Sequence, residues 1–184
     1  MWLPGAVAEH ELIDAEMYIG LISDTHGTFD EPFMKFLEPV DEIWHAGDFG
    51  SLEVAQKIAG FKPLRGVYGN CDGQDIRYDY PLFLDFSCGG MKILMTHIGG
   101  YPGRYDKRAL ALIEECRPDI FVCGHSHILK VMNDAKRGFL VINPGAAGIY
   151  GFHIVRTALR FRIENGRISD MEVFELPKKA GNIL

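Results

Sequence analysis

Residues 17–27 read Met17-Tyr18-Ile19-Gly20-Leu21-Ile22-Ser23-Asp24-Thr25-His26-Gly27, and this segment sets the pattern for the whole chain. Its first six residues are apolar or small, which predicts a buried strand. The strand runs directly into Asp24 and His26. Functional side chains in α/β folds gather beyond the carboxyl ends of strands. The segment therefore predicts a strand that delivers a carboxylate and an imidazole to a site at its tip.

The same pattern, a strand followed by a polar tip, recurs along the chain. Strand candidates at residues 43–46, 64–68, 91–96 and 120–123 each end in side chains that can bind metals or move protons. The tips are Gly47-Asp48, Gly69-Asn70-Cys71-Asp72, Thr96-His97 and Gly124-His125-Ser126-His127. Because strand tips at one edge of a sheet lie close together, we expect these segments to converge in space.

Helices and strands alternate in the first half of the chain, whereas strands dominate the second half. Helix candidates lie at residues 31–37, at 52–59 with Ser51 as N-cap, and at 104–116. Further strand candidates lie at residues 82–86, 129–132, 139–142, 159–163 and 171–176, with a hairpin signal at Cys88-Gly89-Gly90. The polar, turn-rich stretch Gly73–Pro81 is expected to be a loop. This order predicts an α/β fold of two stacked mixed β-sheets flanked by helices.

The length of 184 residues suits one domain with a substantial core. We expect a single domain over residues 17–184, because no internal repeat or low-complexity segment interrupts it. Residues 1–16 precede the first strand signal and are expected to form an N-terminal extension.

Composition limits the classes of function. The net charge is −6 and Lys and Arg form no dense cluster, so we expect no broad nucleic-acid-binding face. A small phosphorylated substrate stays compatible with this charge, because bound metals would add positive charge locally. The four cysteines form no C-x-x-C pair, and we interpret them as reduced thiols of a cytoplasmic protein. We expect no membrane span, and the opening residues make a poor signal peptide.

The strand tips together hold seven side chains that can bind metals: Asp24, His26, Asp48, Asn70, His97, His125 and His127. Mixed imidazole and carboxylate ligands suit manganese, iron, nickel, cobalt or zinc, whereas carboxylates alone would indicate magnesium or calcium. Side chains two positions apart share one face of a strand, which accounts for the Asp-x-His and His-x-His spacings. Two metals roughly 3.5–4 Å apart need a shared ligand, and Asp48 could supply one oxygen to each.

Each of these residues also has a purely structural explanation. Asp24 could form a turn or cap a helix, and His26 or His97 alone would more often be a surface or core histidine. For the pair His125 and His127, a metallo-β-lactamase-like site is the alternative. The residues that follow, Ile128-Leu129-Lys130, lack the next ligands of such a site.

Two further histidines and one turn stay open at this level. His45 could orient a ligand, or it could be a core histidine with satisfied hydrogen bonds. His153 lies outside every block and is expected to be a surface or packing residue. Asn143-Pro144-Gly145 could be a simple tight turn or could contribute to the site.

Taken in chain order, five blocks of this sequence resemble the calcineurin-like metallophosphoesterases, in particular their small single-domain phosphodiesterase branch of bacteria and archaea. The blocks are Asp24-Thr25-His26-Gly27, Gly47-Asp48, Gly69-Asn70-Cys71-Asp72, Thr96-His97 and Gly124-His125-Ser126-His127, and the likeness runs from about Met17 to about Leu176. The resemblance implies a four-layer sandwich that holds two metals. It would place Asp24, His26, Asp48 and His127 on one ion, and Asp48, Asn70, His97 and His125 on the other.

The resemblance implies hydrolysis of a phosphate ester by attack of a hydroxide that bridges two divalent transition-metal ions, with manganese favoured. Asp48, Asn70, Cys71 and Asp72 would then be the catalytic block. The same family resemblance includes a retromer subunit that serves as a protein-interaction scaffold and whose metal site has decayed. This chain keeps all seven ligands, which favours the enzyme. Relatives often self-associate, so a homo-oligomer stays open.

Two local features bear on the substrate. Many relatives have histidine after the asparagine ligand, where this chain has Cys71, so we expect a preference for phosphodiesters with good leaving groups. The loop Ile98–Arg104 follows His97 directly, and Tyr101 or Arg104 could contact the phosphate there. The alternative is a flexible surface loop that leads into the next helix.

Overall fold

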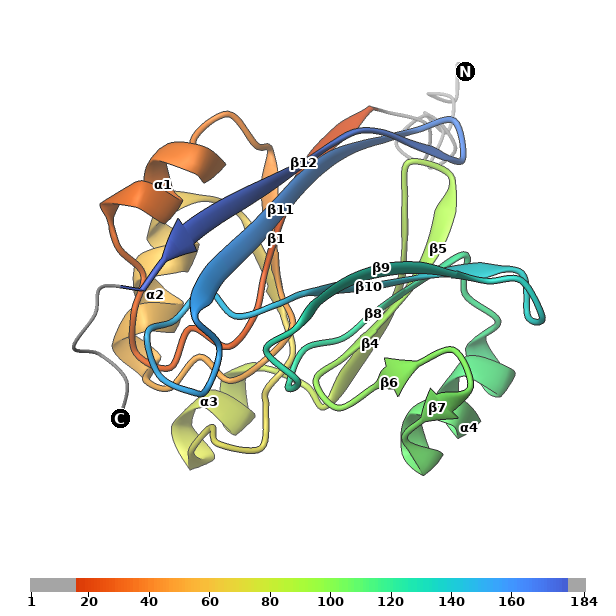
Figure 1. Ribbon diagram of the computed structural model, residues 1–184, viewed down its shortest axis with the longest axis horizontal. Helices are drawn as coiled ribbons and strands as arrows, with labels where there is room; N and C mark the ends of the chain where they lie inside the picture. The colour runs from red at the N-terminus through yellow and green to blue at the C-terminus, as the bar shows by residue number, and fades with distance from the viewer. Residues whose placement is uncertain (1–15, 179–184) are drawn as a thin grey trace, which may run out of the picture.

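The computed structural model describes residues 16–178. They form two five-stranded mixed sheets with helices on the outer faces, which confirms the predicted fold class (Figure 1). The predicted N-terminal extension lies outside the described residues except for Glu16. No helix in the described range is long and apolar enough to cross a membrane.

The first sheet has the strand order β12-β11-β1-β2-β3. Its strands are β1 (Met17–Ile22), β2 (Glu42–His45), β3 (Leu64–Gly66), β11 (Val155–Glu164) and β12 (Arg167–Pro177). β1, β2 and β3 run parallel, and β11 and β12 continue the sheet in antiparallel pairs.

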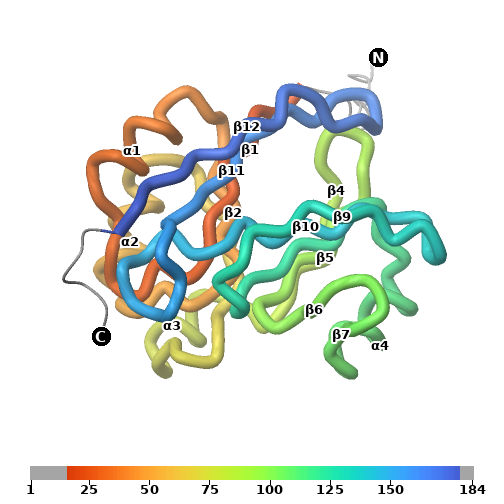
Figure 2. The backbone as a smooth tube through the Cα atoms, in the orientation of Figure 1, coloured from red at the N-terminus to blue at the C-terminus, as the bar shows by residue number. Residues whose placement is uncertain are grey.

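The second sheet has the order β4-β5-β8-β10-β9 and is mixed as well. Its strands are β4 (Phe83–Cys88), β5 (Met91–Thr96), β8 (Ile120–Val122), β9 (Leu129–Asp134) and β10 (Phe139–Pro144). The central strands β5, β8 and β10 are parallel, and each edge strand pairs antiparallel with its neighbour. Figure 2 shows the β4–β5 turn reaching the β11–β12 turn, where Gly166 N donates to Gly89 O (2.8 Å).

Alternation along β1 explains the layers. Ile19 and Leu21 point into the cluster shared with the second sheet, and each such buried side chain contributes about 1.5–3 kcal/mol. Tyr18 and Ile22 point to the opposite face, which α1 (Glu31–Leu37) and α2 (Leu52–Phe61) cover. The outer face of the second sheet packs on α4 (Lys107–Cys116). The order of layers is thus helix, sheet, sheet, helix.

The structure corrects two sequence predictions. The stretch Gly73–Pro81 is not only loop, because it contains the helix α3 (Gln74–Asp79), which Ile76 anchors in the core. A single apolar anchor leaves no helical period to detect. The predicted helix at 104–116 begins later, at Lys107, because Asp106 caps it by accepting from Arg108 N and Ala109 N. The residues before it form a short hairpin of β6 (Gly100–Tyr101) and β7 (Arg104–Tyr105).

The carboxyl ends of the six parallel strands meet at one edge of the sandwich. β1, β2 and β3 lead to Asp24, Asp48 and Asn70, and β5 and β8 lead to His97 and to the His125–His127 segment. The sixth, β10, leads into the loop that carries residues 145–154. The predicted convergence of strand tips is therefore confirmed.

Candidate metal centre

The loops of the site adopt a backbone that ordinary residues avoid. Eight described non-glycine residues have positive φ, and five of them are predicted ligands: Asp24 (54°), His26 (44°), Asp48 (58°), His125 (68°) and His127 (56°). Left-handed backbone is uncommon outside glycine, although Asp and His tolerate it better than most residues. Such conformations persist where surrounding contacts impose them, and they cluster at functional sites.

Backbone hydrogen bonds impose these conformations by joining the loops after β1 and β2. Asp24 N donates to Gly47 O (2.9 Å), and His26 N donates to Asp48 O (3.0 Å). Gly69 lets the β3 loop approach the same place, because a Cβ atom there would overlap Asp48 Oδ1. The strand tips are therefore held together by main chain.

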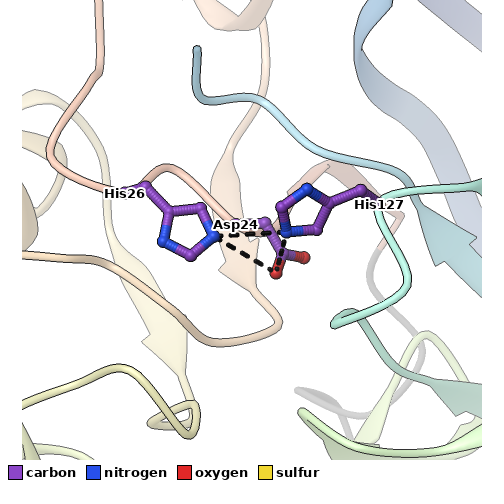
Figure 3. A group of neighbouring side chains, drawn as sticks. All are labelled: Asp24, His26 and His127. Carbon is purple, nitrogen blue, oxygen red and sulfur yellow. Dashed lines mark hydrogen bonds and ion pairs between the residues drawn. The ribbon is translucent and has the colours of Figure 1, made fainter. Parts of the chain in front are cut away.

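The first group of candidate ligands is Asp24, His26 and His127 (Figure 3), whose ligand atoms all lie within 4.8 Å of one another. His127 Nε2 lies 3.1 Å from Asp24 Oδ1 and 3.2 Å from His26 Nε2. His26 Nε2 is 3.8 Å from the same carboxylate oxygen. Three ligand atoms, two from the loop after β1 and one from the loop after β8, thus point at one small volume.

One oxygen of this group is unsatisfied. Asp24 Oδ2 accepts hydrogen bonds from Ser23 Oγ (2.6 Å) and His125 N (3.1 Å). Asp24 Oδ1 is fully buried and receives no hydrogen bond from the described residues. A buried carboxylate oxygen without a partner is costly in free energy unless a cation binds it. The donor set and this bare oxygen therefore fit a divalent metal ion.

The second group is Asp48, His97 and His125, again within 4.8 Å, with the Asn70 amide beside it. His97 Nε2 lies 3.2 Å from Asp48 Oδ2 and 3.1 Å from Asn70 Oδ1. His97 Nδ1 donates to Ala46 O (2.8 Å), which directs Nε2 into the site. Asp48 Oδ2 also lies 3.8 Å from His26 Nε2, so this carboxylate lies between the two groups.

The protonation states of Asp48 and His26 suit metal binding. Although burial opposes its charge, hydrogen bonding and the charge of His97 hold the pKa of Asp48 well below its usual range. Burial lowers the pKa of His26 and so favours its neutral, ligating form. Burial opposes the charge of His97 as well, but Asp48 and Asp24 raise its pKa.

His45 is a core histidine that also ties the two acidic loops together. It is fully buried, stacks on Phe49 with ring centroids 3.7 Å apart, and accepts from Gly47 N at Nδ1 (3.1 Å). Its Nε2 therefore donates to Thr25 Oγ1 (2.9 Å). Burial lowers the pKa of His45 to about 3. Both alternatives left open for this residue are thus partly right.

The other members of the predicted catalytic block take different positions. Asp72 points away from the cavity, because its oxygens accept from Gly50 N (2.9 Å) and Gly69 N (2.8 Å) and so brace the loops. Cys71 is exposed beside the metal centre, and its main-chain N donates to Asp48 Oδ1 (2.8 Å). Desolvation and the charge of Asp48 raise the pKa of this thiol to about 11. At neutral pH, Cys71 therefore presents a neutral S–H group.

Two cavities open at the site. The larger, about 530 Å³, is lined by Cys71, by the rim residues Ile128, Tyr150 and Phe152, and by five predicted ligands: His26, Asp48, Asn70, His125 and His127. The smaller, about 330 Å³, lies against Asn70 and His97. Tyr101 and Arg104 line neither of these two cavities. They face each other across the β6–β7 hairpin, where Lys130 lies over the Tyr101 ring.

Sequence reasoning missed the role of His153 and left that of Asn143 open. His153 was expected to be a surface or packing residue, yet its Nδ1 lies 3.1 Å from His127 Nδ1. Asn143 donates through Nδ2 to Gly124 O (2.7 Å) and to Ser126 Oγ (3.2 Å), so it braces the His125–His127 loop. The Asn-Pro-Gly turn was a usable signal for Asn143, whereas no local pattern marks His153.

Comparison with known proteins agrees with this architecture. A model of the calcineurin-like phosphoesterase superfamily domain matches residues 17–166. The chain belongs to this superfamily. A probable metallophosphoesterase of Methanothermobacter thermautotrophicus is 26% identical over 137 residues, which cover 71% of this chain and 77% of that protein. The predicted family resemblance is thus confirmed.

Solved structures of the superfamily share the fold. An archaeal phosphodiesterase has a TM-score of 0.64 at 24% identity and covers 87% of this chain and 100% of its own. Vacuolar protein sorting 29 from Cryptosporidium parvum has a TM-score of 0.63 at 20% identity, over 90% of this chain and 100% of its own. At these identities the likeness establishes the sandwich, and the chemistry rests on the residues of this chain.

Proposed function

We propose that this chain is a dinuclear metal-dependent phosphoesterase. Asp24, His26, Asp48 and His127 would hold one divalent ion, and Asp48, Asn70, His97 and His125 the other. The observation that carries the proposal is the convergence of these side chains in two groups, one of which surrounds the bare, buried Oδ1 of Asp24. A structural role alone gives no reason to bury a carboxylate oxygen without a partner.

Two bound ions would lower the pKa of a water molecule and neutralise charge on the phosphoryl oxygens. The residues of the chain supply what those ions need. Asp24 and Asp48 offset the metal charge, and the fixed loops hold the imidazoles in place. Cys71 lies beside Asp48, where it would face the reacting phosphate as a neutral, weak donor.

We further propose that the substrates are phosphodiesters. A neutral thiol gives the phosphate no cationic contact. A monoester dianion loses more binding from the absence of that contact than a diester monoanion does. Asn70 lines both cavities, so a phosphate at the metal centre could direct one ester group into each. The four free cysteines agree with a cytoplasmic location, and self-association stays a prediction.

A scaffold function is the second candidate, because vacuolar protein sorting 29 proteins share the fold. The residues of this chain favour catalysis over a purely scaffolding role. All seven predicted ligands are present: six of them form the two groups that contain histidine and aspartate, and the seventh, the Asn70 amide, lies beside His97. A protein that only binds partners would not require this arrangement.

Metal removal tests the proposal. Chelator-treated protein should lose hydrolysis of bis(p-nitrophenyl) phosphate and should regain it best with manganese, nickel or cobalt, with iron and zinc tested alongside. Calcium serves as the control, because it prefers all-oxygen ligands. Metal analysis should give two transition-metal ions per chain in the active form. Full activity in rigorously metal-free protein would overturn the proposal.

A further inference from the structure

The cavity of about 330 Å³ beside the metal centre has no assigned ligand. Asn70 and His97 form the wall that it shares with the metal centre, and the remaining walls are mainly apolar, with Leu82, Ile98 and Leu112 among them. A group held in this cavity would therefore touch the candidate metal ligands on one side and hydrocarbon on the other.

Two arginines line this cavity, Arg77 and Arg108. The Arg77 guanidinium lies over the Tyr68 ring, 4.9 Å from its centroid, and is fixed by donating to Asp72 O (2.8 Å) and Asn70 O (3.2 Å). Arg108 lines the cavity from the first turn of α4. The one carboxylate of the lining, Asp106, is engaged as the cap of that helix.

We propose that this cavity binds a planar aromatic ester group of the substrate while the phosphate lies at the metal centre. Flat aromatic groups pack on apolar walls and stack on tyrosine and guanidinium planes. The volume lies at the lower end for ligand pockets, which suits one ring system and not a polymer. The inference rests on the proposed function, because it deepens the substrate class of that same site.

Calorimetric binding to the manganese-loaded protein tests this without any need for turnover. Phenylphosphonate and thymidine 5′-phosphate should bind about 10-fold more tightly than methylphosphonate. Leu112→Trp, which fills the cavity, should abolish that difference and leave methylphosphonate binding unchanged. Leu110→Trp, on the same helix but outside the cavity lining, should preserve it.

Failure of the cavity assignment and failure of the proposed function give different results. Equal affinity for aromatic and methyl ligands, or an unchanged preference in Leu112→Trp, overturns the cavity assignment. Loss of all phosphonate binding together with absence of two metals would instead overturn the proposed function.

A second, independent observation concerns His153 in the loop after β10. His153 Nε2 lies 3.0 Å from Gly148 O, and a carbonyl can only accept, so Nε2 carries the proton. The Nδ1 atom of a neutral His153 is then an acceptor. It lies 3.1 Å from His127 Nδ1, which must therefore donate. This leaves the lone pair of His127 Nε2 directed at Asp24 Oδ1, 3.1 Å away.

The loop is shaped to allow this contact. Gly151 has φ of 113°, and a Cβ atom at this position would overlap His127 Nδ1. Gly148 packs equally closely on the main chain of Asp24 and Thr25. The geometry assigns His153 as a positioning residue that fixes the ring orientation and tautomer of His127.

Two matched variants test this assignment. His153→Phe keeps the bulk but removes the acceptor, and it should weaken binding of one of the two metals by about 10–100-fold. His153→Asn keeps an acceptor near the Nδ1 position and should restore most of that affinity. In the metal-free protein, ¹⁵N NMR should report His127 protonated at Nδ1, and this tautomer should be lost in His153→Phe only.

Equal weakening in both variants would assign the effect to packing and overturn the role of His153. So would an unchanged His127 tautomer in His153→Phe. Both variants change a half-exposed loop side chain, so thermal unfolding close to wild type is expected for each.

Discussion

The two sheets contribute to the metal centre in different ways. The first sheet supplies both carboxylates, Asp24 and Asp48, which are 0% and 2% exposed and whose loops are joined by main-chain hydrogen bonds. The second sheet supplies His97, His125 and His127. Of these imidazoles, His97 donates to a main-chain oxygen, Ala46 O, whereas His127 is oriented by a side chain, that of His153.

A ligand can thus be positioned either by the main chain or by a contact with another side chain. Where main chain sets the position of a ligand, replacing the side chain changes the chemistry but leaves the loop in place. Where one side-chain contact sets it, a residue outside the site controls the ligand. The acidic side, Asp24 and Asp48, should therefore respond to substitution of its own ligands, and His127 should also respond to substitution of its partner His153.

The largest effect is expected for Asp48→Asn, on the acidic side. The variant should lose more than 10²-fold in kcat/KM, beyond the roughly 10–100-fold typical of residues that only orient ligands. The reason is that Asp48 lies between the two groups of ligands, so its charge serves both. Metal analysis should show fewer than two tightly bound ions.

Asp170→Asn is the matched control for that change. Asp170 shares the left-handed backbone of Asp48, with φ of 49° against 58°, but it lies on the surface far along the chain. Asparagine tolerates this backbone, so neither variant should strain the chain. Two ions bound tightly by Asp48→Asn would count against Asp48 as the shared ligand.

The next effect concerns His45, which braces the acidic loops. Its pKa is about 3 in the folded chain against 6.5 when unperturbed, so below about pH 6.5 the unfolded state takes up a proton that the folded state refuses. Stability from this group is therefore present above pH 6.5 and lost as pH falls towards 3. The full loss is roughly 5 kcal/mol.

His45→Gln carries no titrating group at this position and isolates that contribution. Urea unfolding of metal-free protein between pH 4 and 7 should give a smaller decrease in the free energy of unfolding for the variant than for wild type. Parallel curves for the two proteins would show that His45 does not govern acid stability.

The third effect concerns Cys71. Its replacement by histidine should change hydrolysis rates by about 10²-fold, which is at the lower end of what general-acid catalysis contributes. Cys71→His should raise the rate for diesters with poor alkoxide leaving groups and should raise monoester hydrolysis relative to diester hydrolysis. An imidazole can donate a proton and carry charge, whereas this thiol stays neutral. Cys71→Ala is the control that removes the thiol without adding a base.

Matched mono- and diesters with good and poor leaving groups provide the measurement. If histidine leaves both the mono/diester ratio and the leaving-group dependence unchanged, Cys71 does not set the specificity.

The sequence predicted the acidic side better than the partners of the imidazoles. The ligands follow strands with strong apolar signals, so both the sheets and the tips could be located from local pattern. His153 is 26 positions beyond His127, in a loop without periodicity, and only the fold brings the rings together. The helix α3 escaped prediction for a related reason, since its burial depends on Ile76 alone.

The smallest effects compare two arginines. From the sequence, Arg104 could contact the phosphate or could lie in a flexible surface loop. In the structure it lies in the β6–β7 hairpin and lines neither cavity at the site, whereas Arg108 lines the smaller one. Arg108→Ala should weaken binding of aromatic phosphonates a few-fold, and Arg104→Ala should change it less than about two-fold, as expected for exposed charges.

Salt dependence sharpens this last comparison. Arg108 is exposed, so its attraction for an anionic ligand is screened once the Debye length falls to about 3 Å near 1 M salt. The difference between wild type and Arg108→Ala should therefore shrink as salt rises, while the preference for aromatic over methyl ligands, which rests on apolar contact, should persist. A larger loss in Arg104→Ala than in Arg108→Ala would move the phosphate contact to the hairpin and reverse the comparison.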